Sequence, residues 1–91
     1  MSKTEFIRAL ADKTGMSAKD AATAVNASLD IIQEALQQGE SVAFTGFGTF
    51  EVKSRAARTG RNPKTKEAIE IPASRAPVFK AGKPLKEAVN G

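Results

Sequence analysis

The chain has 91 residues, of which 41% are hydrophobic and 26% charged, a composition typical of one small soluble domain. Cysteine and histidine are both absent, which excludes disulfides, thiolate metal sites and every nucleophile that histidine activates. No apolar stretch approaches the roughly 20 residues needed to cross a bilayer, and the N-terminus carries no hydrophobic signal core. We therefore expect a soluble, cytoplasmic protein without metal or cofactor. Catalysis by carboxylates or lysines alone stays open.

The charge is divided unevenly along the chain. Residues 1–52 hold four basic and seven acidic side chains, a net −3, whereas residues 53–75 hold seven basic and two acidic ones, a net +5. Residues 76–91 add a net +2, which gives the total of +4. Solvated surface charge explains many such patterns, but an acidic first half and a basic second half favour a polyanionic partner that one part of the chain binds.

Two helices are predicted in the first half. Ser2 to Glu5 fits a capping box, apolar residues follow on one helical stripe, and Gly15 is a natural stop. A second start signal at Ser17, with Asp20 three residues later, predicts a helix that runs to about Gln38 and ends at Gly39.

The second helix carries a wider apolar arc than one partner needs. Its main stripe includes Val25, Leu29, Ile32 and Leu36, and alanines lie beside it. The arc is compatible with burial within one chain, or with burial against a second chain as well, and the helix alone does not decide between them.

A change to alternating periodicity follows. Val42 and Phe44 alternate with Ala43 and Thr45, the sequence Gly46-Phe47-Gly48 interrupts, and Phe50 resumes the alternation. This pattern predicts a hairpin, and its phenylalanines are expected in the core rather than stacked on bases.

Residues 53–75 are predicted to form a β-ribbon arm. Runs 53–61 and 67–75 have strand periodicity but few apolar residues, and the segment between them contains a turn signal around Pro63. Two strands of about nine residues would extend roughly 30 Å. Pro72 and Pro77 cannot donate to a ladder, so they suit edge, bulge or strand-exit positions.

The arm leaves 68 residues to form the core, close to the lower limit for an independent fold without disulfides or metal. We therefore expect an obligate or near-obligate dimer, whose two arms could embrace one duplex. Seven cations on a slim ribbon, with no Leu- or Trp-rich amphipathic face, favour nucleic acid over a membrane. Pro63 at the tip could insert between base pairs or merely stiffen the turn, and its position alone leaves both roles open.

Three segments carry specific motifs: Gly46-Phe47-Gly48-Thr49-Phe50, the run Arg58-Thr59-Gly60-Arg61-Asn62-Pro63 preceded by Arg55, and Ala73 to Lys83. Together they resemble the HU/integration-host-factor family of bacterial DNA-bending proteins over essentially the whole chain. The combination of GFG-x-F with R-x-G-R-N-P at this separation is highly specific.

The resemblance implies an α+β fold in which two N-terminal helices form an intertwined dimer body. A three-stranded antiparallel sheet extends into the arm, and a short helix with Leu85, Ala88 and Val89 facing inward ends the chain. On this basis residues 1–52 are the dimerisation body, 53–75 the DNA-binding arm, and 76–91 the sheet return and C-terminal helix. The implied dimer core consists of Val25, Leu29, Ile32, Leu36, Phe44, Phe47, Phe50 and Phe79.

The resemblance also implies a set of DNA-binding residues, with Pro63 as the intercalating wedge and Gly46 and Gly48 bringing backbone amides near phosphate. The set comprises Lys3, Gly46, Gly48, Lys53, Arg55, Arg58, Arg61, Asn62, Pro63, Lys64, Lys66, Arg75, Lys80, Lys83 and Lys86. Many family members place Gly after the tip Thr, where this chain has Lys66. If that position requires a positive φ, the tip turn differs here.

The leading hypothesis is a nucleoid-associated homodimer that binds duplex DNA in the minor groove with little sequence specificity and bends it, preferring nicked or flexible sites. Three alternatives remain: a site-specific subunit of the integration-host-factor type, binding of RNA or another structured nucleic acid, and an enzyme that uses lysine at damaged DNA. A-form RNA admits such a ribbon poorly because its major groove is deep and narrow.

Overall fold

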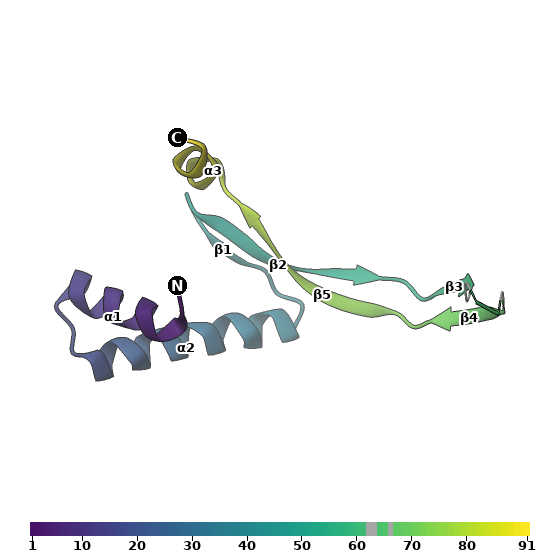
Figure 1. The fold of residues 1–91 in the computed structure, drawn as a ribbon, viewed down its shortest axis with the longest axis horizontal. Coiled ribbons are helices and arrows are strands. Elements are labelled where there is room, and N and C mark those ends of the chain that lie inside the picture. Colours follow the sequence, from purple (N-terminus) through teal and green to yellow (C-terminus); the bar gives the residue numbers. More distant parts are fainter. Residues whose placement is uncertain (62–63, 66) are drawn as a thin grey trace. The chain divides into compact units, whose positions relative to one another are not determined.

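The computed structural model describes residues 1–61, 64–65 and 67–91, apart from the side chains of Arg58 and Ile71. The described chain divides into two compact units, Met1–Ala35 and Leu36–Gly91, which we treat separately. Three helices and antiparallel strands confirm the predicted α+β class (Figure 1). None of the helices in the described ranges is long and apolar enough to span a membrane.

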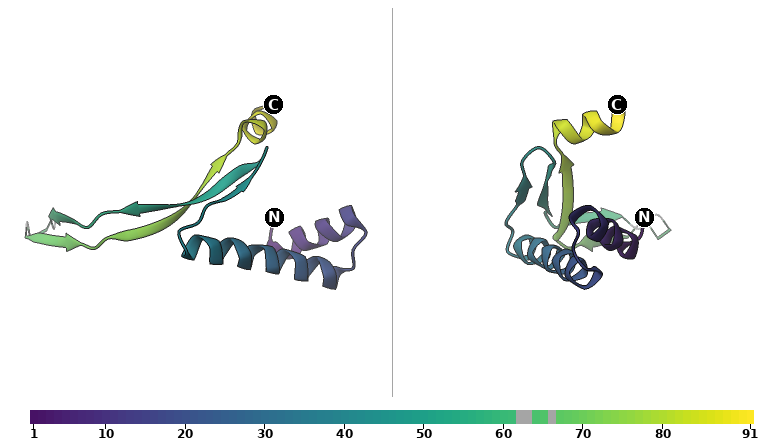
Figure 2. Two further views of the ribbon diagram at one scale, coloured as in Figure 1. Left: turned by 180° about the vertical axis from the view of Figure 1, so that it is seen from behind. Right: turned by 90° about the vertical axis from the view of Figure 1, so that its left-hand side faces the viewer.

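The first unit is a helix pair whose ends are set by the predicted caps. Helix α1 spans Lys3–Thr14, and the Ser2 hydroxyl accepts a hydrogen bond from the backbone N–H of Glu5 at 3.2 Å. At its other end Gly15 takes the left-handed conformation, φ 75°, and donates to the Ala11 carbonyl. Helix α2 spans Ala18–Gln37 and lies alongside α1 in both views of Figure 2.

This helix pair covers little of its apolar surface. Among the described residues only Ala21 and Val25 are buried hydrophobic side chains, while Phe6 is 53% and Leu29 50% exposed. An open hollow of about 290 Å³ lies between Phe6 and Leu10 of α1 and Val25 and Leu29 of α2. The wide apolar arc of α2 is therefore only partly covered by α1.

The second unit is built around a three-stranded antiparallel sheet. Strand β1 (Val42–Phe44) pairs with β2 (Gly48–Arg55), which pairs with β5 (Ser74–Ala81), so that β2 is central. The predicted hairpin is confirmed, with Val42 opposite Phe50 and Phe44 opposite Gly48. Pro77 lies on β5, an edge strand of the sheet, as a residue without a backbone N–H requires.

The arm differs from the prediction of two continuous nine-residue strands. Pairing of β2 with β5 ends at the Arg55–Ser74 rung, and a separate two-stranded ladder of β3 (Arg58–Arg61) and β4 (Ala68–Ile71) follows. The interruption covers residues 56–57 and 72–73. It coincides with Pro72, which has no N–H to offer to a ladder. Figure 1 shows β3 and β4 beyond the far end of the three-stranded sheet.

Helix α3 (Lys83–Asn90) follows β5 at the other end of the sheet (Figure 1). Gly82 precedes it and Pro84 lies in its first turn, where a missing N–H costs nothing. Leu85 is half-buried, but Ala88 is exposed and Val89 is 79% exposed. The expectation that all three face inward is therefore wrong for Ala88 and Val89 within the single chain.

Strand alternation gathers phenylalanines on one face of the sheet. The rings of Phe50 and Phe79, which are cross-strand partners, have centroids 4.8 Å apart. Phe44 packs edge-on against Phe50 at 6.2 Å, and Phe47 lies 5.8 Å from Phe79. Gly48 is buried beneath this cluster, and a Cβ there would collide with the Phe79 ring and lie 2.7 Å from the Lys80 carbonyl oxygen.

We expect Gly48→Ala to lower the free energy of unfolding by about 1–3 kcal/mol, the usual cost of forcing an extra carbon into packed surroundings. Urea unfolding at fixed protein concentration measures the change. Thr49→Ala, at the next position of β2 on the other face, should alter it by less than about 0.5 kcal/mol. A Gly48→Ala protein as stable as wild type would show that Phe79 can move aside freely.

Candidate nucleic-acid interface

The β2–β5 ladder separates charged from apolar side chains. In antiparallel pairing, directly opposed residues share a face and successive residues alternate. One face therefore carries the Phe50–Phe79 pair and the Val52–Pro77 pair. The opposite face, which we call the charged face, carries Thr49, Glu51, Lys53 and Arg55 of β2, with Lys80, Val78, Ala76 and Ser74 of β5 as their partners.

Two kinds of charge meet on the charged face. Lys53, Arg55 and Lys80 lie on it together, so three of the predicted DNA-binding cations share one surface. Glu51 is the negatively charged residue on this face, and its carboxylate lies 3.3 Å from the Lys80 ammonium. Because the Lys80 side chain is 63% exposed, water screens this pair and the ammonium stays accessible to a polyanion.

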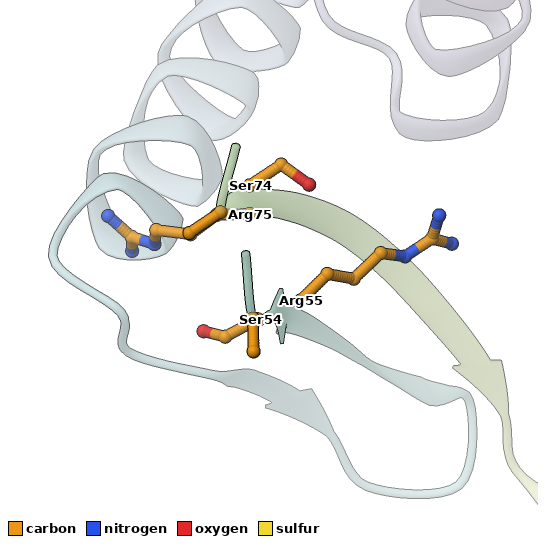
Figure 3. A pocket seen from close by; sticks show the side chains of 6 residues that line it. Ser54, Arg55, Ser74 and Arg75 are labelled. Atoms are coloured by element: carbon orange, nitrogen blue, oxygen red, sulfur yellow. The ribbon is translucent and has the colours of Figure 1, made fainter. Parts of the chain in front are cut away.

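At the base of the arm two arginines lie on opposite sides of the ladder. Arg55 is paired with Ser74, and Arg75 with Ser54, so the alternation directs their side chains to opposite faces, as Figure 3 shows. An open hollow of about 590 Å³ lies here, lined by Ser54, Arg55, Ala56, Ala73, Ser74 and Arg75. The Arg75 guanidinium donates to the Leu36 carbonyl at 3.1 Å and to the Gln37 carbonyl at 3.3 and 3.4 Å. Arg75 thus lies on the face of the ladder opposite Lys53, Arg55 and Lys80.

The outer arm, beyond the Arg55–Ser74 rung, carries further cations, and the structure describes the side chains of some of them. Arg61 pairs with Ala68 and its side chain is exposed, as is that of Lys64. The backbone of Arg58 pairs with Ile71, but the Arg58 side chain lies outside what the structure describes. Asn62, Pro63 and Lys66 also lie outside the described residues, and with them the predicted wedge and the question of the Lys66 turn.

The two glycines of the first motif have different surroundings. Gly46 has φ +83° in the β1–β2 turn, a conformation that favours glycine, and no atom would approach an added Cβ within 4 Å. Gly48 is buried against Phe79. Packing thus explains Gly48 without a phosphate, whereas Gly46 lies in an exposed turn.

The remaining predicted cations lie on helices. Lys83 and Lys86 are exposed on α3, and Lys83 makes a long ion pair of 4.0 Å with Glu87. Lys3 is exposed in the first turn of α1, in the other unit. No cluster of acidic side chains within the described ranges could hold a metal ion.

The residues predicted for the dimer core are incompletely covered in the single chain. Val25 is buried, and Ile32, Leu36 and Phe50 are half-buried. Leu29, Phe44, Phe47 and Phe79 are between 42% and 50% exposed. Ile31, at 63%, is a further exposed apolar side chain of α2.

The contact of Arg75 with the end of α2 was not predicted from the sequence, because its partners are backbone carbonyls 38 and 39 residues away. One signal was present: the last turn of α2 contains no basic residue of its own. A helix C-terminus attracts cations, so a cation from elsewhere in the fold could have been anticipated.

Comparison with known proteins identifies the family. A sequence model of the family described as bacterial DNA-binding protein matches residues 1–90. DNA-binding protein HU of Geobacillus stearothermophilus is 58% identical over 89 residues, covering 98% of this chain and 99% of the relative. DNA-binding protein HU of Clostridium pasteurianum is 53% identical over 90 residues, covering 99% of each chain.

Solved structures agree with the sequence relatives. The chain is similar to Anabaena HU in a cocrystal with DNA, with a TM-score of 0.86 and 47% identity over 98% of this chain and 97% of that one. It is also similar to HU from Thermotoga maritima, with a TM-score of 0.69 and 35% identity over 98% of each chain. The chain therefore belongs to the HU family of bacterial DNA-binding proteins.

Proposed function

We propose that this protein is a histone-like architectural homodimer that binds duplex DNA in the minor groove with little sequence specificity, and bends it or stabilises bends through two β-arms. The observation that carries this proposal is the charged face of the β2–β5 ladder, where Lys53, Arg55 and Lys80 lie together. The ribbon beyond it adds the exposed cations Arg61 and Lys64. A dimer would present this surface twice.

The chemistry of the arm supports weak sequence specificity. Lysine and arginine on phosphates fix the position of a protein on DNA but carry no sequence information. Side-chain amides, which can read adenine through two hydrogen bonds, are almost missing from residues 53–75, where Asn62 is the sole one. Preference should then follow how easily the DNA deforms.

The proposed interface retains most of the predicted set, and we propose residues 53–75 as the DNA-binding arm on a body formed by 1–52 and 76–91. Its members are Lys3, Gly46, Lys53, Arg55, Arg58, Arg61, Asn62, Pro63, Lys64, Lys66, Lys80, Lys83 and Lys86. Pro63 is proposed as the intercalating wedge. The family is one of structural DNA-binding proteins, which supports a role in the nucleoid without catalysis.

Binding to intact and nicked duplexes of the same sequence, across a range of salt, tests the proposal. We expect the nicked duplex to bind at least about tenfold more tightly, equivalent to about 1.4 kcal/mol, because a nick lowers the cost of bending. Unrelated intact sequences should bind alike. A single preferred sequence would favour the site-specific alternative, and equal affinity for intact and nicked DNA would contradict the bending role.

Pro63→Ala should reduce DNA bending more than it reduces affinity, because a wedge acts on the shape of the duplex while cations supply most of the attraction. Energy transfer between dyes at the two ends of a duplex, at saturating protein, measures the bend. Pro84→Ala, in the exposed first turn of α3, is the matched control and should bend DNA like wild type. Unchanged bending by Pro63→Ala would leave Pro63 a turn residue only.

Glu51→Gln should tighten binding to DNA by a few-fold, since it removes the negative charge beside Lys80 from the charged face. The effect should correspond to about 0.2–1 kcal/mol, the range for exposed ion pairs, and should shrink as salt rises. Glu34→Gln makes the same chemical change on α2, outside the β2–β5 ladder, and should have a smaller effect. Weaker binding by Glu51→Gln would mean that the carboxylate holds Lys80 in place for DNA.

Sedimentation at low micromolar concentration should show a dimer, because too few apolar side chains are covered within one chain. Leu29→Glu should shift the protein toward monomer and lower its apparent stability, since burying a charge in the interface is costly. Thr23→Glu adds the same charge at an exposed position of α2 that lies about 120° around the helix from Leu29, and it should remain dimeric. A stable, folded wild-type monomer would contradict the proposal.

A further inference from the structure

The side chain of Arg75 ends against the backbone at the end of α2. Its two terminal nitrogens lie 3.1 to 3.4 Å from the carbonyl oxygens of Leu36 and Gln37, at the end of α2. Figure 3 shows Arg75 directed toward that helix end, while Arg55 points the other way from the adjacent strand. Arg75, Leu36 and Gln37 all belong to the second unit, so their contact lies within one compact body.

The helix end offers what a guanidinium needs. The last carbonyls of a helix lack partners within it and carry a partial negative charge. The last turn of α2 has no basic side chain, and the Leu36 carbonyl receives one N–H, from Gly39 at 3.0 Å. The planar fork of Arg75 supplies the further donors and the missing positive charge in a single side chain.

The contact also lies at the point where the arm leaves the sheet. Arg75 and Ser54 form the second-last rung of the β2–β5 ladder, and Arg55 with Ser74 forms the last one. Beyond it, residues 56–57 and 72–73 are outside any ladder, so the base of the arm has no further strand pairing to hold its direction. A side chain that joins this rung to the end of α2 fixes the direction in which the arm begins.

We propose that Arg75 is a positioning residue, which anchors the base of the arm to the last turn of α2 and makes no contact with DNA phosphate. The inference concerns the free protein, and it rests on the proposed function only where DNA bending is the readout. The two arginines at the arm base then have different roles: Arg55 binds phosphate, and Arg75 fixes the direction of the arm.

Side-chain NMR of the wild-type dimer tests the anchor without any substitution. In the free protein the four Nη–H signals of Arg75 should be separate, because hydrogen bonds from both terminal nitrogens slow rotation about Nε–Cζ and about the two Cζ–Nη bonds. These signals should stay unchanged when DNA is added. Arg55 should show averaged signals that separate only with DNA. Averaged Arg75 signals in the free protein would overturn the proposal. Failure to bind DNA would overturn the proposed function instead and leave this result standing.

Matched variants then separate geometry from charge. Arg55→Gln should lower the slope of log K against log salt by about 0.9 per lost phosphate contact. Arg75→Gln should leave the slope unchanged and weaken binding by a similar factor at every salt concentration. At saturating protein it should also reduce the energy transfer that reports the bend, which Arg55→Gln should not.

Each other outcome for Arg75→Gln counts against the anchor. A lowered slope would make Arg75 a phosphate ligand. An unchanged slope with an unchanged bend at saturation would make the helix-end contact irrelevant to the arm, even if the protein became less stable. Should Arg75→Gln not fold, Arg75→Lys keeps the charge but loses the fork, and it should reduce the bend with the slope unchanged.

Discussion

The structure depends on a shortage of internal burial. An arm of 23 residues contributes almost nothing to a core, and among the described residues the buried hydrophobic side chains are Ala21 and Val25. Apolar burial supplies most of the free energy that offsets chain entropy, so a chain that covers so little cannot be stable by itself. The exposed Phe6 and Leu29 in one unit, and Phe44, Phe47 and Phe79 in the other, are surfaces that a second copy would cover. This shortage of burial is what supports the proposed dimer, in which the second copy would stabilise the rest of the fold.

Side chains alternate between the two faces of the β2–β5 ladder, and this alternation couples the apolar cluster to the proposed DNA-binding surface. One face carries Phe50 and Phe79 and belongs to the apolar cluster, while the other carries Lys53 and Arg55. A shift of the register by one residue would exchange these faces, placing arginine among the apolar side chains and phenylalanine on the charged face. The same packing that orders the phenylalanines therefore orders the cations. This coupling explains why Gly48, which makes room for the Phe79 ring, matters to a surface it does not share.

Much of the fold could be predicted because its signals are local. At the start of both α1 and α2 a serine hydroxyl accepts a hydrogen bond from the backbone N–H three residues later. These hydrogen bonds form as expected at Ser2 and Ser17. Helix α2 ends at Gln37, one residue before the expected end, because the Gly39 N–H already bonds the Leu36 carbonyl. The interrupted arm and the exposed Val89 were not predicted, since alternation in sequence does not show where pairing stops or which side chains one copy can cover.

The role of Arg75 shows why a count of charges overstates an interface. Residues 53–75 hold seven cations in sequence, and Arg55 and Arg75 lie on two antiparallel strands, as the sequence predicts. The sequence does not give the register of these strands, and it is the register, Ser54–Arg75 and Arg55–Ser74, that directs the two arginines to opposite faces. Arg55 lies on the charged face, whereas Arg75 lies on the other face and donates to a carbonyl at the end of α2. The useful quantity for DNA binding is thus the number of cations on one face of the ladder, which requires the register and not the composition.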